Sequence, residues 1–155
     1  MEATFLTRLR RFVPDERLLE WYPPFRHMRI RVLEARDGWR GLRILLPLNR
    51  RTRNLEGTIF GGAQASLADP IPALACARIF SGFRALTRNL ALDFIAPGTG
   101  NLELRFSFAP AQETWIASRL AAGGRAQITF GYGFYRSDGI CCTRVRNTVD
   151  LRSRP

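Results

Sequence analysis

One stretch of the chain, residues 54–69, constrains the fold more than any other. A polar loop there reaches a glycine pair, Gly61 and Gly62, and a long run of apolar and small residues follows. Glycines at such a junction let the backbone bend or be approached closely, so the pattern predicts a loop that opens into a helix. The run continues to about Phe80 and is apolar or small on nearly every side. We therefore expect this helix to be buried, with Pro70 and Pro72 interrupting it.

Asp69 is the only carboxylate between Gly57 and Ala77. A carboxylate among apolar neighbours is costly unless a helix end, a hydrogen bond or a reaction partner satisfies it. We therefore expect Asp69 to be buried and to have a specific task. One such task is structural, because Asp followed by Pro favours the start of a helix and Asp69 would then be a helix cap.

The rest of the chain predicts a sheet around this helix. Apolar and polar residues alternate in six segments, near residues 28–32, 42–46, 89–94, 102–108, 126–134 and 141–149, and residues 137–139 predict a hairpin turn. Short helices are expected at residues 3–12, at 15–21 with its end at Pro23-Pro24, and at 112–122 with its end at Gly123-Gly124. Six strands and one buried helix predict the α+β class, with an antiparallel sheet wrapped around the helix.

Composition predicts one domain, residues 1–155, in which residues 1–25 form an N-terminal helical extension. The chain is 46% hydrophobic and 24% charged, which suits a single core. Its three cysteines have neither a disulfide nor a metal-binding spacing, so no metal is expected. No apolar run is long enough to span a bilayer, and residues 1–14 lack the hydrophobic centre of a secretory signal. We expect a cytoplasmic protein.

The formal net charge is +11, and the basic side chains are 24 arginines, no lysine and one histidine. A basic surface favours anionic partners such as nucleic acid, acidic lipid or a phosphorylated cofactor like coenzyme A. Codon usage in a GC-rich genome would give the same excess of arginine. The arginines are scattered, with no zinc spacing and no aromatic motif of RNA-binding domains, so nucleic acid is not the expected partner.

The residues around the glycine pair also carry a resemblance. Asn54, Gly57, Gly61-Gly62 and residues 67–69 resemble the signature of hotdog-fold acyl-CoA thioesterases of the phenylacetate-pathway (PaaI-like) type. In that group the helix begins with His-Gly-Gly and an Asp lies eight residues after the first glycine. The spacing is kept here, but Phe60 stands where the His would be.

The run Gly-Thr-x-Phe-Gly-Gly followed by Ala-Asp-Pro is similar to the DUF4442 branch of the same superfamily, as are residues 22–25, 49–54 and 96–98. The resemblance extends from about Tyr22 almost to the end of the chain. It implies the hotdog fold: a six-stranded antiparallel sheet wrapped around one long central helix, here with short N-terminal helices.

Thioester hydrolysis needs a polarised carbonyl and an activated water. The backbone N–H of Gly61, at a helix N-terminus, is the predicted oxyanion donor. Asp69 is the predicted general base or nucleophile, and Asn54 would orient the water or the Asp. At ~1.5 Å per residue, Gly61 and Asp69 lie roughly 12 Å apart on one helix, so one acyl carbonyl cannot touch both. The site should then lie across the interface of a homodimer, or of a dimer of dimers, as the resemblance also implies.

Five further residues are predicted to bind substrate: Gly57, Thr58, Phe60, Gly62 and Arg88. Phe60 cannot hydrogen-bond as a His would, but it can line an acyl pocket. Each prediction has a structural alternative. The glycines would also permit close helix packing, Asn54 would hold its loop in a turn, and Arg88 would be a solvated charge. His27, the only histidine, and Cys76 have no spacing that supports a triad, and Cys76 is expected in the core.

The leading hypothesis is an acyl-CoA thioesterase-like protein that takes coenzyme A as part of its substrate and needs no separate cofactor. The alternative is a non-catalytic hotdog module that binds acyl-CoA or another acyl lipid. A purely structural or partner-binding domain is the third possibility.

Overall fold

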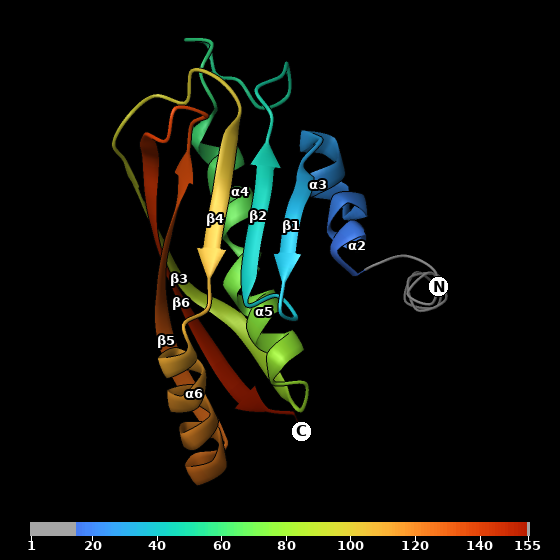
Figure 1. Cartoon of the computed structure of the whole chain (residues 1–155), viewed down its shortest axis with the longest axis vertical. Coiled ribbons are helices and arrows are strands. Elements are labelled where there is room, and N and C mark those ends of the chain that lie inside the picture. The colour runs from blue at the N-terminus through green and yellow to red at the C-terminus, as the bar shows by residue number, and fades with distance from the viewer. Residues whose placement is uncertain (1–14, 155) are drawn as a thin grey trace.

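The structure is a computed structural model that describes residues 15–154. Its sheet contains six strands in the order β1-β2-β4-β5-β6-β3, and every neighbouring pair is antiparallel. The strands are β1 (Arg31–Arg36), β2 (Gly41–Leu46), β3 (Phe83–Phe94), β4 (Leu102–Ser107), β5 (Arg125–Tyr135) and β6 (Cys141–Ser153). The sheet wraps around two consecutive helices, α4 (Gly61–Ala68) and α5 (Pro70–Ile79), as Figure 1 shows. This is the hotdog fold, as predicted.

The core lies between the concave face of the sheet and α4–α5. Leu67 and Ile71 from the helices are fully buried, and Phe130 and Phe134 on β5 face them from the sheet. Phe106 packs edge-on against Phe130 at a ring distance of 5.6 Å. Alternation along β4 and β5 therefore places every second side chain in this core, which is the period that the sequence shows.

The central helix is not continuous. Asp69 separates α4 from α5, and Pro70 and Pro72 follow at once. Proline lacks an N–H and cannot donate to the carbonyl four residues earlier, so the break is where the sequence predicts it.

The remaining helices are α2 (Asp15–Trp21), α3 (Pro23–Met28) and α6 (Pro110–Gly123). The first two lie along the β1 side of the sheet, and α6 lies at one end beside β5 and β6 (Figure 1). Helix α6 ends at Gly124 in a left-handed conformation, φ 64°, as the Gly-Gly pair predicts.

The helix predicted at residues 15–21 is confirmed as α2, which ends at Trp21 before Pro23-Pro24. These prolines also begin a helix that the sequence analysis did not predict, α3, because proline is well accommodated in the first turn of a helix. One predicted boundary nearby is wrong. Met28 is the last residue of α3 and not part of the first strand, which begins at Arg31. The helix expected at residues 3–12, and most of the extension expected at residues 1–25, lie outside the described residues.

Candidate functional site

The loop that precedes α4 is held by several hydrogen bonds. Thr52 is fully buried, its hydroxyl donates to the carbonyl of Pro47 at 2.6 Å, and its own carbonyl accepts from the N–H of Phe60 at 2.7 Å. Asn49 joins the same loop to α3 by donating from Nδ2 to the carbonyl of Met28 at 3.0 Å. The backbone before Gly61 is thus fixed from both sides.

Asn54 holds a turn at the tip of this loop. Its Nδ2 donates to the Thr58 hydroxyl at 2.9 Å, and its Oδ1 accepts from the Thr58 backbone N–H at 3.0 Å. Gly57, between them, has φ 77°, a conformation that favours glycine. The predicted residues Asn54, Gly57 and Thr58 therefore form one structural unit, and the turn role foreseen for Asn54 is confirmed.

Aromatic rings cover both glycines at the N-terminus of α4. A Cβ on Gly61 would lie 2.9 Å from the Phe94 ring, and a Cβ on Gly62 would lie 2.3 Å from the Phe60 ring. A Cβ at either position would displace a ring from the helix. The N–H of Ala63 donates to the carbonyl of Phe60, so α4 begins at the residue after Phe60, as expected from the sequence.

A cavity of about 420 Å³ opens at this helix end. The side chains and backbone that line it include Asn54, Thr58, Gly61, Gln64, Phe94 and Gly98. A second hollow, of about 680 Å³, shares Asn54 and is lined also by Gly57, Phe60, Arg50 and Arg53. Five of the predicted site residues therefore line two adjoining hollows, and Phe60, which is 53% exposed, is one of the walls.

Asp69 does not line either hollow, and the expectation that it is buried is wrong for this chain by itself. It is exposed, because it lies at the junction of α4 and α5 on a side that the sheet does not cover. The capping alternative is not observed either. The backbone at Asp69 stays helical, φ −46° and ψ −57°, and its side chain makes no capping hydrogen bond.

Side chains from the sheet bind the carbonyl groups at this helix break. Pro72 cannot donate to the carbonyl of Ala68, and the hydroxyl of Tyr132 on β5 donates to it instead, at 2.7 Å. The carbonyl of Asp69 accepts from the Thr87 hydroxyl at 2.8 Å and from Asn147 Nδ2 at 2.9 Å. Burial raises the pKa of the Tyr132 hydroxyl far above its ordinary value, so it is a neutral donor here. Strands β3, β5 and β6 thus hold the backbone that carries the Asp69 side chain.

Arg88 lies apart from the cavity at Gly61. It is exposed on β3, at an irregularity in the pairing with β6 between Thr87 and Asn89. This strand is twelve residues long and forms one edge of the sheet. Within one chain, the structure therefore brings Asn54, Thr58 and Gly61 together but leaves Asp69 and Arg88 elsewhere.

Gln64 is a residue of the cavity that the sequence prediction missed. It lies on α4, is only 3% exposed, and its Oε1 accepts a hydrogen bond from the buried Thr143 hydroxyl at 2.5 Å. The available signal was a single amide in a helix segment otherwise made of Gly, Ala, Ser and Leu.

Two other reactive side chains do not belong to the site. Cys76 is fully buried, and burial raises the pKa of its thiol to about 12, so it is a core residue as predicted and not a nucleophile at neutral pH. His27 is exposed in the last turn of α3. Among the residues that the structure describes, no group of three or more His, Cys, Asp or Glu side chains could hold a metal ion.

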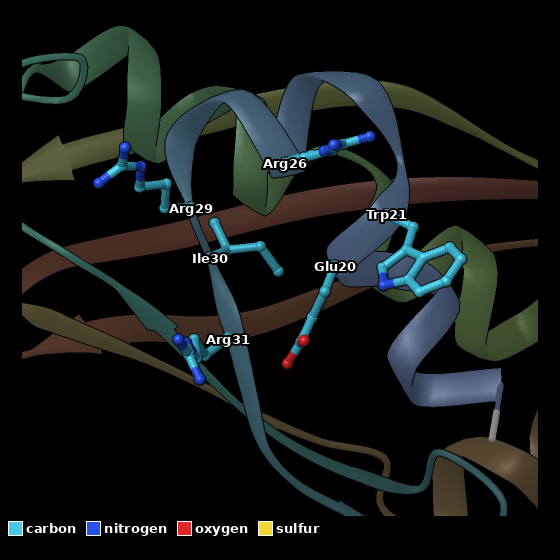
Figure 2. A pocket seen from close by; sticks show the side chains of 6 residues that line it. All are labelled: Glu20, Trp21, Arg26, Arg29, Ile30 and Arg31. Carbon is cyan, nitrogen blue, oxygen red and sulfur yellow. The ribbon is translucent and has the colours of Figure 1, made fainter. Parts of the chain in front are cut away.

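Basic residues continue outward from the hollow at Asn54. Arg51 donates to the carbonyl of His27 at 3.3 Å and so connects the loop to α3. A further hollow of about 660 Å³ lies beside α3 (Figure 2). Arg29 and Arg31 stand on one side of it, and Arg26, the exposed Trp21 and the carboxylate of Glu20 stand on the other. The surface from Asn54 to α3 is therefore suited to an anion more than to a neutral ligand.

Comparison with known proteins decides the family. The model of the domain of unknown function DUF4442 matches residues 16–151. The chain belongs to the DUF4442 family. No curated protein is significantly similar to it in sequence.

Solved structures share the fold of this DUF4442 protein at low identity. A Pseudomonas aeruginosa protein of unknown function, named a probable thioesterase, has a TM-score of 0.81 and 17% identity, over 92% of this chain and 97% of that one. A protein of unknown function from Chlorobaculum tepidum has a TM-score of 0.74 and 14% identity, over 90% and 92%. A Staphylococcus aureus thioesterase has a TM-score of 0.60 and 15% identity, over 88% and 98%. These similarities establish the fold. In the described part of the DUF4442 chain, no helix is long and apolar enough to cross a membrane.

Proposed function

We propose that this protein is a thioester hydrolase that acts on acyl-CoA or a related acyl thioester, in a cytoplasmic setting. The observation that carries the proposal is the cavity at the N-terminus of α4. There Gly61, the first residue of the helix, adjoins a hollow walled by apolar side chains and by Asn54. Backbone N–H groups at a helix N-terminus stabilise the oxygen of a tetrahedral intermediate.

The general base in this proposal is Asp69 of a second copy. Along one helix it is too far from Gly61 to reach the same carbonyl, and in this chain it is exposed and makes no side-chain cap. An exposed carboxylate at a helix break fits a group that meets its partner only in an assembly. Edge strand β3, with Leu86 51% exposed and Phe94 59% exposed, is the surface on which we propose that a C2 dimer forms.

The reaction then proceeds by water attack. Asp69 takes a proton from the water while the water oxygen bonds to the carbonyl carbon of the thioester. The carbonyl oxygen gains negative charge beside the Gly61 N–H. Collapse of the intermediate breaks the C–S bond, and the proton passes to the departing thiolate. Attack by the Asp69 carboxylate, followed by hydrolysis of the anhydride, gives the same products.

The spacing of two substituted residues in a structural neighbour supports the roles proposed for Asn54 and Asp69. The Staphylococcus aureus thioesterase has been crystallised with a glutamine replaced by alanine and with a glutamate replaced by alanine, and these positions are fifteen residues apart. Asn54 and Asp69 have the same separation here. We propose that they form the corresponding polar pair, Asn54 from one copy and Asp69 from the other.

The other predicted contacts are assigned to the substrate. Gly57, Thr58, Phe60 and Gly62 would shape the acyl and pantetheine path. Arg88, with the arginines beside Asn54, would meet the phosphates of coenzyme A, which enters as part of the substrate. A single domain spanning residues 1–155 stays a prediction.

The test is release of thiol from a panel of aliphatic and aromatic acyl-CoA thioesters by the wild-type protein and by Asp69→Asn. Turnover by the wild type, lost in a variant with an unchanged melting temperature, is the expected result. Turnover that survives in Asp69→Asn would end the proposed role of this residue.

A non-catalytic module that binds acyl-CoA or an acyl lipid is the second candidate. Phe60 favours it, because a phenyl ring at this position supplies acyl contact without a hydrogen bond. Tight binding of acyl-CoA with no thiol release by the wild type would support this candidate against hydrolysis.

A further inference from the structure

Gln64 has an unusual place for an amide. It lies three residues after Gly61 on α4, so both residues share one face of the helix and line the same cavity. The side chain is 97% removed from solvent, since its exposed fraction is 3%. A buried amide normally has partners for both its oxygen and its nitrogen.

The oxygen of this amide has such a partner and the nitrogen does not. Thr143, fully buried on β6, donates its hydroxyl proton to Gln64 Oε1 at 2.5 Å. In this arrangement the oxygen end of the amide points to the sheet. No described residue accepts a hydrogen bond from Nε2, and the side chain borders the cavity of about 420 Å³. The structure thus presents a donor at the wall of the cavity.

We propose that Gln64 Nε2 donates a hydrogen bond to the carbonyl oxygen of the bound thioester, as a second donor beside the backbone N–H of Gly61. This inference rests on the proposed function. It gives the site a side-chain donor although residue 60 is Phe. The amide is neutral and held by Thr143, so it is aligned before substrate arrives and needs little reorganisation as charge develops on the oxygen.

The decisive experiment compares two coenzyme A analogues that cannot be hydrolysed. In the ketone analogue a CH₂ group replaces the sulfur and the carbonyl is kept. In the thioether analogue the sulfur is kept and a CH₂ group replaces the carbonyl. Calorimetry on the wild type should show the ketone binding more tightly than the thioether, because only the ketone can accept from the Gly61 N–H and from Gln64 Nε2. Each neutral hydrogen bond is expected to contribute about two- to tenfold.

Gln64→Met keeps the length and burial of the side chain but removes the donor. We expect it to keep only the part of the ketone preference that the Gly61 N–H supplies, so its affinity for the ketone should fall by about two- to tenfold while its affinity for the thioether stays unchanged. Gln64→Glu can still accept from Thr143 and presents an oxygen where Nε2 lies, so it should bind the ketone more weakly than Gln64→Met does. Ser66→Ala, a change at an exposed position on the same helix, should leave both affinities unchanged.

Turnover gives the second readout. In Gln64→Met we expect kcat to fall by about 10²-fold, with a smaller rise in KM of at most about tenfold, because the hydrogen bond strengthens as the oxyanion forms. A Gln64→Met protein whose ketone preference equals that of the wild type, or that loses affinity equally for both analogues, would overturn the inference while leaving hydrolysis intact. A wild type that binds neither analogue and hydrolyses no thioester would overturn the proposed function itself.

Discussion

The hydroxyl of Tyr132 lies 2.7 Å from the carbonyl oxygen of Ala68 and donates to it, in place of the N–H that Pro72 lacks. Asn147 Nδ2 lies 3.2 Å from the same hydroxyl and also reaches the carbonyl of Asp69. A helix broken by proline leaves carbonyls without donors, and here the sheet provides the donors from its concave face. Hydrogen bonds from the sheet therefore stabilise the break in the central helix.

Removing the Tyr132 hydroxyl should destabilise the protein. Tyr132→Phe leaves the Ala68 carbonyl buried without a donor, and we expect the free energy of unfolding in urea to fall by about 1–3 kcal/mol. Tyr135→Phe is the matched control, because the Tyr135 ring stacks against the Arg105 guanidinium at 4.6 Å and its hydroxyl makes no hydrogen bond to a described residue. Equal stability of Tyr132→Phe and the wild type would mean that the hydroxyl does not hold the break.

Mixing two inactive variants tests whether one site uses two copies. Asp69→Asn lacks the proposed base, and Asn54→Ala loses both hydrogen bonds to Thr58 at the cavity. A mixed dimer would contain one intact site and one doubly defective site. Equal amounts, denatured and refolded together, should recover about a quarter of wild-type activity, since half of the dimers are mixed. No recovery from two folded variants would place both residues in one chain's own site.

A charge on edge strand β3 should prevent dimer formation. Leu86 is 51% exposed on that strand, and Leu86→Arg would bring two arginines together across a C2 axis. We expect light scattering to give a dimer for the wild type and a monomer for Leu86→Arg at micromolar concentration. Leu33→Arg is the control, because Leu33 is 48% exposed on β1, the strand at the opposite edge.

The arginines beside Asn54 should distinguish coenzyme A from its truncated form. Arg53→Gln should raise KM for an acyl-CoA by about two- to fivefold and leave KM for the matching acyl-pantetheine unchanged, because only the former carries the nucleotide phosphates. Added salt should likewise raise KM for the acyl-CoA and leave KM for the acyl-pantetheine unchanged. Arg119→Gln, on α6, is the control. Equal effects on both esters would contradict binding of the nucleotide phosphates by these arginines. Codon usage would then explain the net charge of +11.

Glu103 should make the fold sensitive to acid. Its carboxylate accepts from Arg43 Nε at 2.6 Å and from Arg105 Nε at 2.8 Å. These hydrogen bonds, of which the one from Arg43 has the larger effect, lower the pKa of Glu103 from 4.5 to about 2. Because the folded pKa is below the unfolded one, the stabilisation is complete above pH 4.5 and is lost as the pH falls toward about 2. The stability gap between the wild type and Glu103→Gln should therefore shrink over that interval in urea titrations. Glu56→Gln, in the exposed loop, should show no such change.

The sequence predicted the fold well because the relevant signals are local. Alternation along β4 and β5 defines strands, and the glycine pair marks the start of α4 at the correct residue. Asp69 was different, because its apolar neighbours in sequence do not determine which side of a helix a sheet will cover. Its exposure depends on sheet curvature and on any second copy, and neither is encoded within a few residues.

The same reasoning explains the missed residues. Gln64 becomes informative only when Thr143, 79 positions away, binds its oxygen and leaves its nitrogen at a cavity. Pro23-Pro24 follows the end of α2, as predicted, and also begins α3. The second role was missed because it depends on packing of Phe25 into the core.

One hydrogen bond near the N-terminus has a consequence for how far the molecule can assemble. The N–H of Val32 on β1 donates to Glu20 Oε1 on α2 at 2.9 Å, and α2 packs along that edge of the sheet. Strand β3 has no such cover among the described residues. A sheet with one covered edge and one open edge can extend by edge pairing only once, so we expect edge-to-edge addition to stop at two copies. On this account, Glu20 limits the growth of the sheet into a filament.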